Sequence, residues 1–199
     1  MLFLVRVMQG KIMLKTGLIV NKKRNVVMLQ LIRVLWDICR IKAGPQDLPK
    51  GYNLLIAAVL SGVIIDSFSS SILITKFSLS DIAQIVIVYN VLLLAAVYLL
   101  LKLIGYAERA VQTLTAIAGS GLLISLVLLP GLIMMNTAAE EAKSFAIFIL
   151  IDNIWRIAVN AHIFRHALSV SLLMAMILSV SYLLLGVLVA DVLLPVVSH

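Results

Sequence analysis

Five long apolar stretches dominate this sequence, and each is long enough to cross a lipid bilayer as a helix. The hydrocarbon core of a bilayer requires about 20 such residues. The chain of 199 residues is 63% hydrophobic and 13% charged, whereas roughly 25% of a soluble domain is charged. The sequence therefore predicts an all-α polytopic membrane helix bundle. Its five spans are expected at about residues 53–74, 82–104, 112–135, 145–166 and 168–190, within a membrane domain that covers residues 52–195.

The part of the chain before the first span is strongly basic. Ten of the sixteen Lys and Arg residues precede residue 51, and only Asp37 and Asp47 oppose them there. Residues 1–27 mix basic residues with apolar runs that are too short to span a bilayer. We expect this segment to be a poorly ordered basic extension. A translation start at Met28 would explain its weak patterning, so its membership of the native protein is left open.

The segment 28–51 begins with the two-faced pattern of an amphipathic helix, which we expect over residues 28–43. Leu35, Ile38 and Ile41 belong to an apolar stripe with Trp36 beside it, and basic residues occupy the other face. Such a helix lies along a bilayer surface, where each basic residue is attracted to anionic lipid by about 1 kcal/mol. A helix docked on the cytoplasmic face of the bundle fits the same pattern, and the two placements are compatible.

A Gly- and Pro-rich elbow joins this interfacial helix to the first span. Gly44 is suited to ending a helix, and Pro45 cannot continue one. Pro49 favours an extended backbone at Leu48. We expect a rigid structural turn here.

Ionisable side chains within the apolar spans are the main candidates for a functional site. The fourth span carries Asp152, Arg156 and Asn160, which are spaced four residues apart and therefore share one face of a helix. Asp66 lies in the first span and is a second candidate partner for Arg156. An unpaired charge is strongly disfavoured in hydrocarbon, so we expect Arg156 to have a carboxylate partner.

This polar cluster has two interpretations. Ionisable groups in membranes often mark a proton or ion pathway, which would make the protein a small transporter or channel component. Alternatively, the cluster is structural and sets the register of the helices. The sequence favours the structural interpretation, because only three charged residues lie in the interior of the spans, away from their ends: Asp66, Asp152 and Arg156. A four-span protein with residues 145–166 on the membrane surface is the other topology considered.

A patch of small residues in the third span predicts close helix packing. Gly119, Ser120 and Gly121 would let a neighbouring backbone approach. The same residues do not indicate a phosphate loop, because they lie inside an apolar span. We expect this patch and the basic helix to contact other membrane proteins or a second copy of the chain.

The sequence offers no pattern typical of a catalytic, cofactor or metal site. His162 and His166 have the spacing of two metal ligands, but no third ligand is evident, and a basic helix end is the simpler interpretation. Cys39 is the single cysteine, and we expect it to be a buried or interfacial thiol and not a site of lipidation. No recognisable nucleic-acid module accompanies the basic charge. We therefore expect a non-enzymatic protein that does not bind nucleic acid.

The distribution of basic residues predicts the orientation. With the N-terminus in the cytoplasm, cytoplasmic segments hold thirteen basic residues, whereas the opposite side holds only Lys76 and Lys143. This bias is the one expected for proteins of the bacterial inner membrane. Five spans then place the C-terminus on the opposite side.

The chain resembles bacterial Yip1-type membrane proteins. The resemblance rests on an interfacial N-terminal part, five spans, the segment AIAGSGLLISLVLLPGLI at 116–133, and a final span close to the end. AGPQDLP at 43–49 and WRIAVNAHIFRHAL at 155–168 also resemble segments of small bacterial inner-membrane proteins. The resemblance implies a role in membrane organisation, assembly or trafficking through binding of other membrane proteins.

Overall fold

The computed structural model of the chain describes residues 28–73, 77–137 and 142–197, with the backbone alone at 135–137, 142–144 and 194–197. The expected disorder of residues 1–27 lies outside this range. The chain divides into two compact units, and all packing below lies within the second, Leu35–His199. Helices and no strands occur in the described ranges. Their order is η1 (Pro45–Asp47), α2 (Tyr52–Leu73), α3 (Leu79–Ile104), η2 (Ala107–Arg109), α4 (Ala110–Thr137), α5 (Ala142–Leu168) and α6 (Leu172–Val197).

Five of these helices are long and apolar enough to cross a membrane. They are α2 to α6, and each overlaps one of the predicted spans. The prediction of an all-α, five-span membrane bundle is confirmed at this level. α3, α4 and α5 are longer than their predicted spans, whereas α2 has the predicted length. The predicted start of the fifth span at residue 168 is wrong, because α5 continues to Leu168 and α6 begins at Leu172.

Capping residues explain where α3 begins and ends. Ser78 and Asp81 form a capping box in which each residue's side chain accepts a hydrogen bond from the other's backbone N–H, both at 3.3 Å. At the other end Gly105 has φ +92, a left-handed conformation that glycine adopts without a steric penalty. The capping box therefore fixes the start of α3, and Gly105 fixes its end.

A tight turn joins α5 to α6. Ser169 has φ 55, so the chain reverses within three residues of the end of α5. Arg109, just before α4, donates hydrogen bonds to the carbonyl of Ala167 and to the hydroxyl of Ser169, both at 3.1 Å. The cation thus satisfies carbonyl groups that the end of α5 leaves without helical partners.

The N-terminal helix ends earlier than the sequence predicted. Residues 28–39 are helical, and Ile41 has φ 61. The N–H of Lys42 then bonds to the carbonyl of Asp37 at 2.8 Å, which closes the helix end. The expectation that Ile41 extends the apolar stripe is wrong: its side chain is exposed, whereas Leu35 and Ile38 are buried. A left-handed residue turns its side chain away from the helix face.

The elbow is fastened to α4 and α5 by side chains that bond to its backbone. Gln112 donates to the carbonyls of Leu48 and Gln46. His162 Nε2 donates to the carbonyl of Ala43 at 2.9 Å. As predicted, Leu48 before Pro49 is extended, with ψ 144. The C-terminal part of the amphipathic helix also docks here, because Trp155 Nε1 donates to the carbonyl of Cys39 at 3.0 Å. Docking on the bundle is thus observed for this part of the helix.

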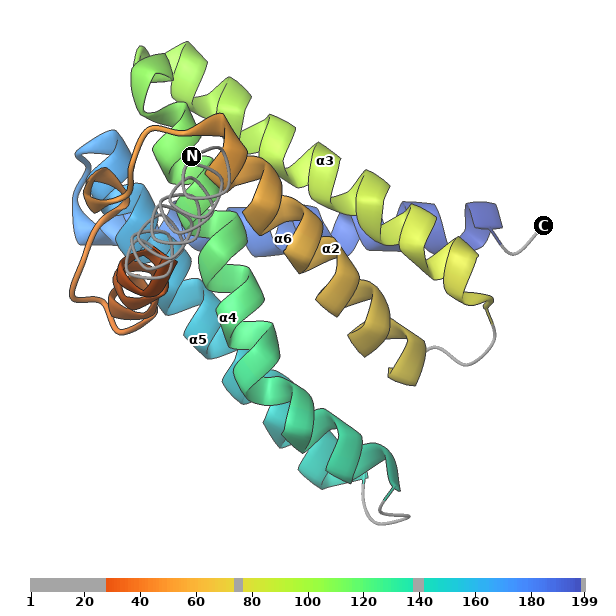
Figure 1. Cartoon of the computed structure of the whole chain (residues 1–199). Helices are drawn as coiled ribbons and strands as arrows, with labels where there is room; N and C mark the ends of the chain where they lie inside the picture. The colour runs from red at the N-terminus through yellow and green to blue at the C-terminus, as the bar shows by residue number, and fades with distance from the viewer. Residues whose placement is uncertain (1–27, 74–76, 138–141, 198–199) are drawn as a thin grey trace, which may run out of the picture. The chain divides into compact units, whose positions relative to one another are not determined.

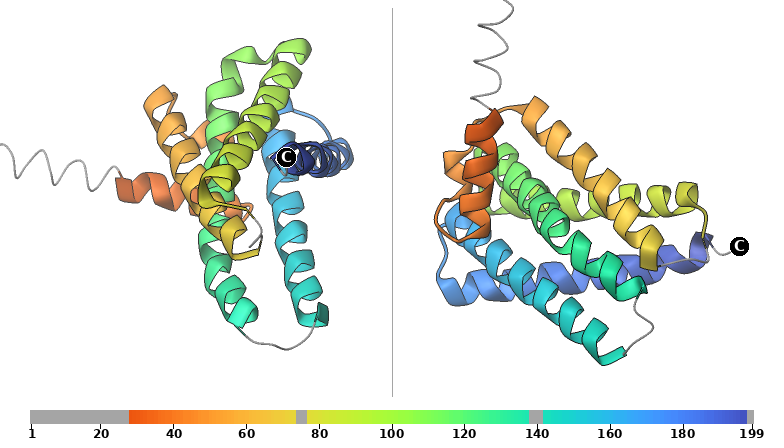
Figure 2. Two further views of the ribbon diagram at one scale, coloured as in Figure 1. Left: turned by 90° about the vertical axis from the view of Figure 1, so that its right-hand side faces the viewer. Right: turned by 60° about the horizontal axis from the view of Figure 1, so that its bottom comes forward.

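The five long helices surround a central space in the order α2, α4, α5, α6, α3 and back to α2. Figure 1 shows α4 and α5 running alongside each other, and Figure 2 shows α2 against α4 from two further sides. Many fully buried side chains gather at the elbow end, including Ile38, Leu48, Leu101, Ile163 and Phe164. This end is closely packed, whereas the polar residues of the spans lie deeper in the bundle.

Candidate functional site

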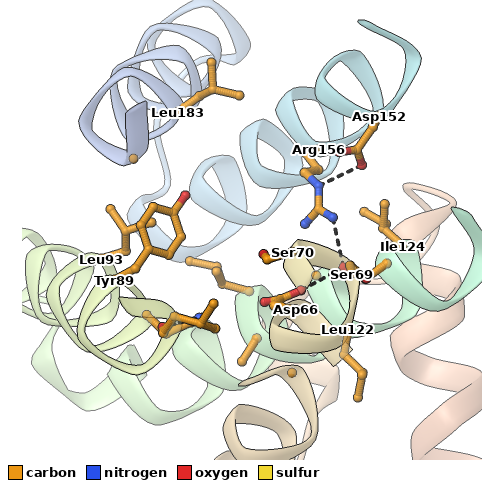
Figure 3. Close-up of a pocket in the computed structure, with 18 of the residues that line it drawn as sticks. Asp66, Ser69, Ser70, Tyr89, Leu93, Leu122, Ile124, Asp152, Arg156 and Leu183 are labelled. Carbon is orange, nitrogen blue, oxygen red and sulfur yellow. Dashed lines mark hydrogen bonds and ion pairs between the residues drawn. The ribbon is translucent and has the colours of Figure 1, made fainter. Parts of the chain in front are cut away.

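The polar residues of the spans meet in a cavity of about 510 Å³ that is lined by all five long helices. α2 contributes Asp66, α4 contributes Ser125 and α5 contributes Arg156, while α3 and α6 contribute Tyr89 and Tyr182. Figure 3 shows Arg156 reaching from α5 towards the side of the cavity that holds Asp66. Asp66 and Arg156, which the sequence offers as candidate partners, thus line the same cavity. Ser125 links the two side chains by hydrogen bonds, in place of a direct ion pair.

A continuous chain of hydrogen bonds links the three ionisable groups. Arg156 Nε donates to Asp152 Oδ1 at 2.8 Å, and Arg156 Nη2 donates to Ser125 Oγ at 3.0 Å. Ser125 Oγ in turn donates to Asp66 Oδ1 at 3.0 Å. The Ser125 hydroxyl can occupy this middle position because a hydroxyl can accept one hydrogen bond and donate another. The expected carboxylate partner of Arg156 is Asp152, and Asp66 is reached through Ser125.

Helix geometry explains why these side chains converge. Asp152, Arg156 and Asn160 follow one another at single helical turns on α5, and all three line the cavity, as their spacing predicted. Gly121 lies one turn before Ser125 on α4. A Cβ at Gly121 would lie 3.8 Å from Arg156 Nη1, so the guanidinium packs against this backbone.

The cavity is open enough for its charged groups to be partly accessible. The side chain of Arg156 is 32% exposed and that of Asp152 is 22% exposed. Most of the lining is nevertheless apolar, with Leu93, Ile124 and Leu183 among its residues. A largely apolar pocket with a few convergent polar groups is the usual character of a small-molecule site.

The small-residue patch of α4 is used for packing within the chain. Ser120 is 1% exposed and its carbonyl lies 3.8 Å from the Sγ of Cys39. A Cβ at Gly119 would lie 2.6 Å from a methyl group of Leu35. Gly119 and Ser120 thus admit the N-terminal helix, and Gly121 admits Arg156. Their contact with other proteins stays a prediction, and these inner contacts leave little of the patch for it.

The two histidines of α5 lie at the elbow end of the bundle. His162 and His166 pack edge to face, with ring centroids 4.5 Å apart. Among the residues that the structure describes, no three His, Cys, Asp or Glu side chains are grouped as metal ligands. The observed partner of His162 is the backbone carbonyl of Ala43.

Sequence reasoning missed Ser125, the residue that connects the two charged helices. A single serine in an apolar span is ordinarily able to bond to its own helix backbone, so it gives a weak signal. The position of Ser125 one turn after Gly121 could have indicated that it faces a neighbouring helix. Small and hydroxyl residues on one face of a span are typical of helix–helix interfaces. Tyr89 and Tyr182 were also missed, since aromatic residues are common in spans.

Comparisons of the chain with protein-family models, with curated proteins and with solved structures give no match. The resemblance to Yip1-type proteins stays a prediction.

Proposed function

We propose that this integral membrane protein is a small, non-enzymatic transporter or channel component that binds a solute in its central cavity. The observation that supports the proposal is the placement of the Asp66–Ser125–Arg156–Asp152 network in the wall of a cavity shared by five helices. A purely structural ion pair requires only that its charges be sheltered. A cavity beside such an ion pair is consistent with a bound ligand, and ionisable groups within membranes often bind or conduct a solute.

This proposal departs from the role in binding other membrane proteins that the sequence first favoured. The α4 patch expected to make those contacts packs against Leu35 and Arg156 of the same chain. Hydrogen bonds connect the three ionisable residues within the bundle, as expected for a structural cluster. These residues nevertheless line the cavity, which a purely structural cluster does not require. Membrane organisation or assembly through partner binding is the function that remains if the cavity proves closed to water.

The charge distribution supports a cytoplasmic elbow end in a bacterial inner membrane. Contacts of Gln112 with Leu48 and of Arg109 with Ala167 bring the start of α4, the elbow and the end of α5 to one end of the bundle. Cytoplasmic ends of spans are rich in Lys and Arg, and anionic lipid is then the expected surface partner. The basic residues at or next to this end are Arg40, Lys42, Lys50, Lys102, Arg109 and Arg165.

Access of water to the cavity tests the proposal. A cysteine would be placed at Ser69, which lines the cavity, in a Cys39→Ala background. The matched control is Leu188→Cys on α6, whose side chain is 62% exposed on the apolar outside. Both variants would be treated in proteoliposomes with a charged, membrane-impermeant thiol reagent from each side.

A conducting or solute-binding cavity predicts rapid modification of the Ser69→Cys protein and slow modification of the Leu188→Cys protein. Equal, slow modification of both would contradict the proposal and would favour a closed, structural polar cluster.

A further inference from the structure

The charged groups that line the cavity do not balance. Asp66 and Asp152 carry two carboxylates, and Arg156 carries the one cationic group among the described lining residues. Arg156 is already bonded to Asp152 and to Ser125. The lining therefore has one excess negative charge when both carboxylates are ionised, and such an excess is costly at membrane depth unless a cation or a proton compensates it.

Resting on the proposed function, we infer that the solute is a small organic cation, an alkylated ammonium, which binds beside Asp66. An anion would meet the carboxylates of a site whose single guanidinium is already engaged. An uncharged solute would leave a proton as the only means of compensating the excess charge. A cation is the class of solute that removes it.

The lining of the cavity offers the surfaces that an organic cation needs. Tyr89 projects into the cavity from α3, as Figure 3 shows, and Tyr182 lines it from α6. Aromatic faces attract cations, and quaternary ammonium groups are bound in this way. Leu93 and Leu183 provide apolar area for the alkyl groups. The volume of about 510 Å³ lies within the range of sites for small organic molecules.

The closeness of α6 to Tyr89 supports a built aromatic wall. A Cβ at Gly186 would lie 2.6 Å from the Tyr89 hydroxyl oxygen, so the absence of a side chain there lets the phenol reach α6. The ring is thus held between α3 and α6 at the edge of the cavity.

Binding of choline to the purified full chain in a maltoside detergent tests this inference. The comparison solute is the uncharged isostere in which carbon replaces the quaternary nitrogen, and titration calorimetry measures both. We expect choline to bind at least about tenfold more tightly than the isostere, because only choline gains the attraction of the carboxylate.

Three variants make the test specific to the cavity. Asp66→Asn is expected to weaken choline binding by about tenfold, and Asp66→Glu, which keeps the charge, is expected to retain it. Asp191→Asn removes an acidic residue of α6 that does not line the cavity, so it leaves binding unchanged. Size-exclusion chromatography of each variant verifies that it is folded.

The outcomes separate the inference from the proposed function. Equal affinity for choline and the isostere, no choline binding at millimolar concentration, or unchanged binding in Asp66→Asn would overturn the cationic solute. Rapid modification of the Ser69→Cys protein would still support a solute cavity in each of those cases. Slow modification of that protein would overturn both.

Discussion

The Nε atom of Arg156 lies 2.8 Å from Oδ1 of Asp152, one helical turn earlier on α5. The same guanidinium extends across the bundle to Ser125 of α4. One side chain therefore links a local pair, which the sequence spacing dictates, to a distant carboxylate on α2 that only the fold brings near.

The two members of this pair contribute unequally to stability. Arg156→Gln is expected to lower the free energy of unfolding by about 2 kcal/mol, because two carboxylates lose their cation. This cost is below that of a fully buried pair, since the Arg156 side chain is 32% exposed. Asp152→Asn is expected to cost about 1 kcal/mol or less, because Arg156 keeps Ser125 and the charge of Asp66. Unfolding titrations in mixed micelles measure both, and equal losses would contradict the asymmetry.

The hydroxyl of Ser125 is the bridge between α2 and α5. Ser125→Ala removes both of its hydrogen bonds, and we expect a loss of about 1–2 kcal/mol in the free energy of unfolding. Ser71→Ala is the control, because Ser71 is half-buried and its hydroxyl donates to the carbonyl of Phe68 on its own helix. Thermal unfolding in detergent compares the two, and a Ser71→Ala loss as large as that of Ser125→Ala would argue against the bridge.

Close packing at Gly119 predicts a destabilising substitution that a second substitution relieves. A Cβ there would lie 2.6 Å from a methyl carbon of Leu35, so Gly119→Ala is expected to cost about 1–3 kcal/mol. Adding Leu35→Ala makes room, and the pair is expected to cost less than the sum of the two single substitutions.

Gly62→Ala provides the matched control for that experiment. Among the described residues, no atom outside the adjacent backbone of its own helix lies within 4 Å of a Cβ at Gly62. Alanine is favoured over glycine within a helix, so this substitution is expected to stabilise the protein by about 0.5–1 kcal/mol. Additive losses at Gly119 and Leu35 would show that the two residues do not compete for space.

Cys39 gives a pH-dependent readout of the docked N-terminal helix. Burial raises the pKa of its thiol to about 11, so the reactive thiolate is scarce at neutral pH and increases as the pH rises towards that value. We expect slow maleimide labelling at neutral pH and faster labelling in alkaline buffer. Gly119→Ala is expected to accelerate labelling at neutral pH by loosening the contact with Leu35.

An exposed cysteine calibrates the Cys39 measurement. Gln46→Cys in a Cys39→Ala background places the thiol on the exposed side of the elbow. Its labelling is expected to be fast at neutral pH. Comparable rates for Cys39 and the cysteine at position 46 would contradict the burial of Cys39.

Hydropathy was sufficient to predict the five spans, because the bilayer imposes both their length and their composition. The face shared by Asp152, Arg156 and Asn160 was equally predictable, since a helix has a fixed periodicity. Leu48 before Pro49 is extended for a reason that lies in two adjacent residues. These are all local properties of the chain.

The features that the sequence did not predict depend on tertiary structure. Ser125 gains its role only because α4 lies between α2 and α5, and no local pattern specifies that order of helices. Ile41 adopts the left-handed conformation just after the N-terminal helix although it is neither Gly nor Asn, because neighbouring contacts fix the elbow. The docking of the C-terminal part of that helix, from Leu35 onwards, likewise depended on a complementary surface on α4 that composition does not describe.

The ring order of the helices has a consequence for biogenesis. α6 packs between α5 and α3, and it is the last of the five spans in chain order. Synthesis therefore completes α5, with Arg156, before it reaches α6, the last wall of the cavity. A nascent chain halted before Leu172 already holds Asp152 and Ser125, so Arg156 has its hydrogen-bonding partners and only the α6 wall of the cavity is missing.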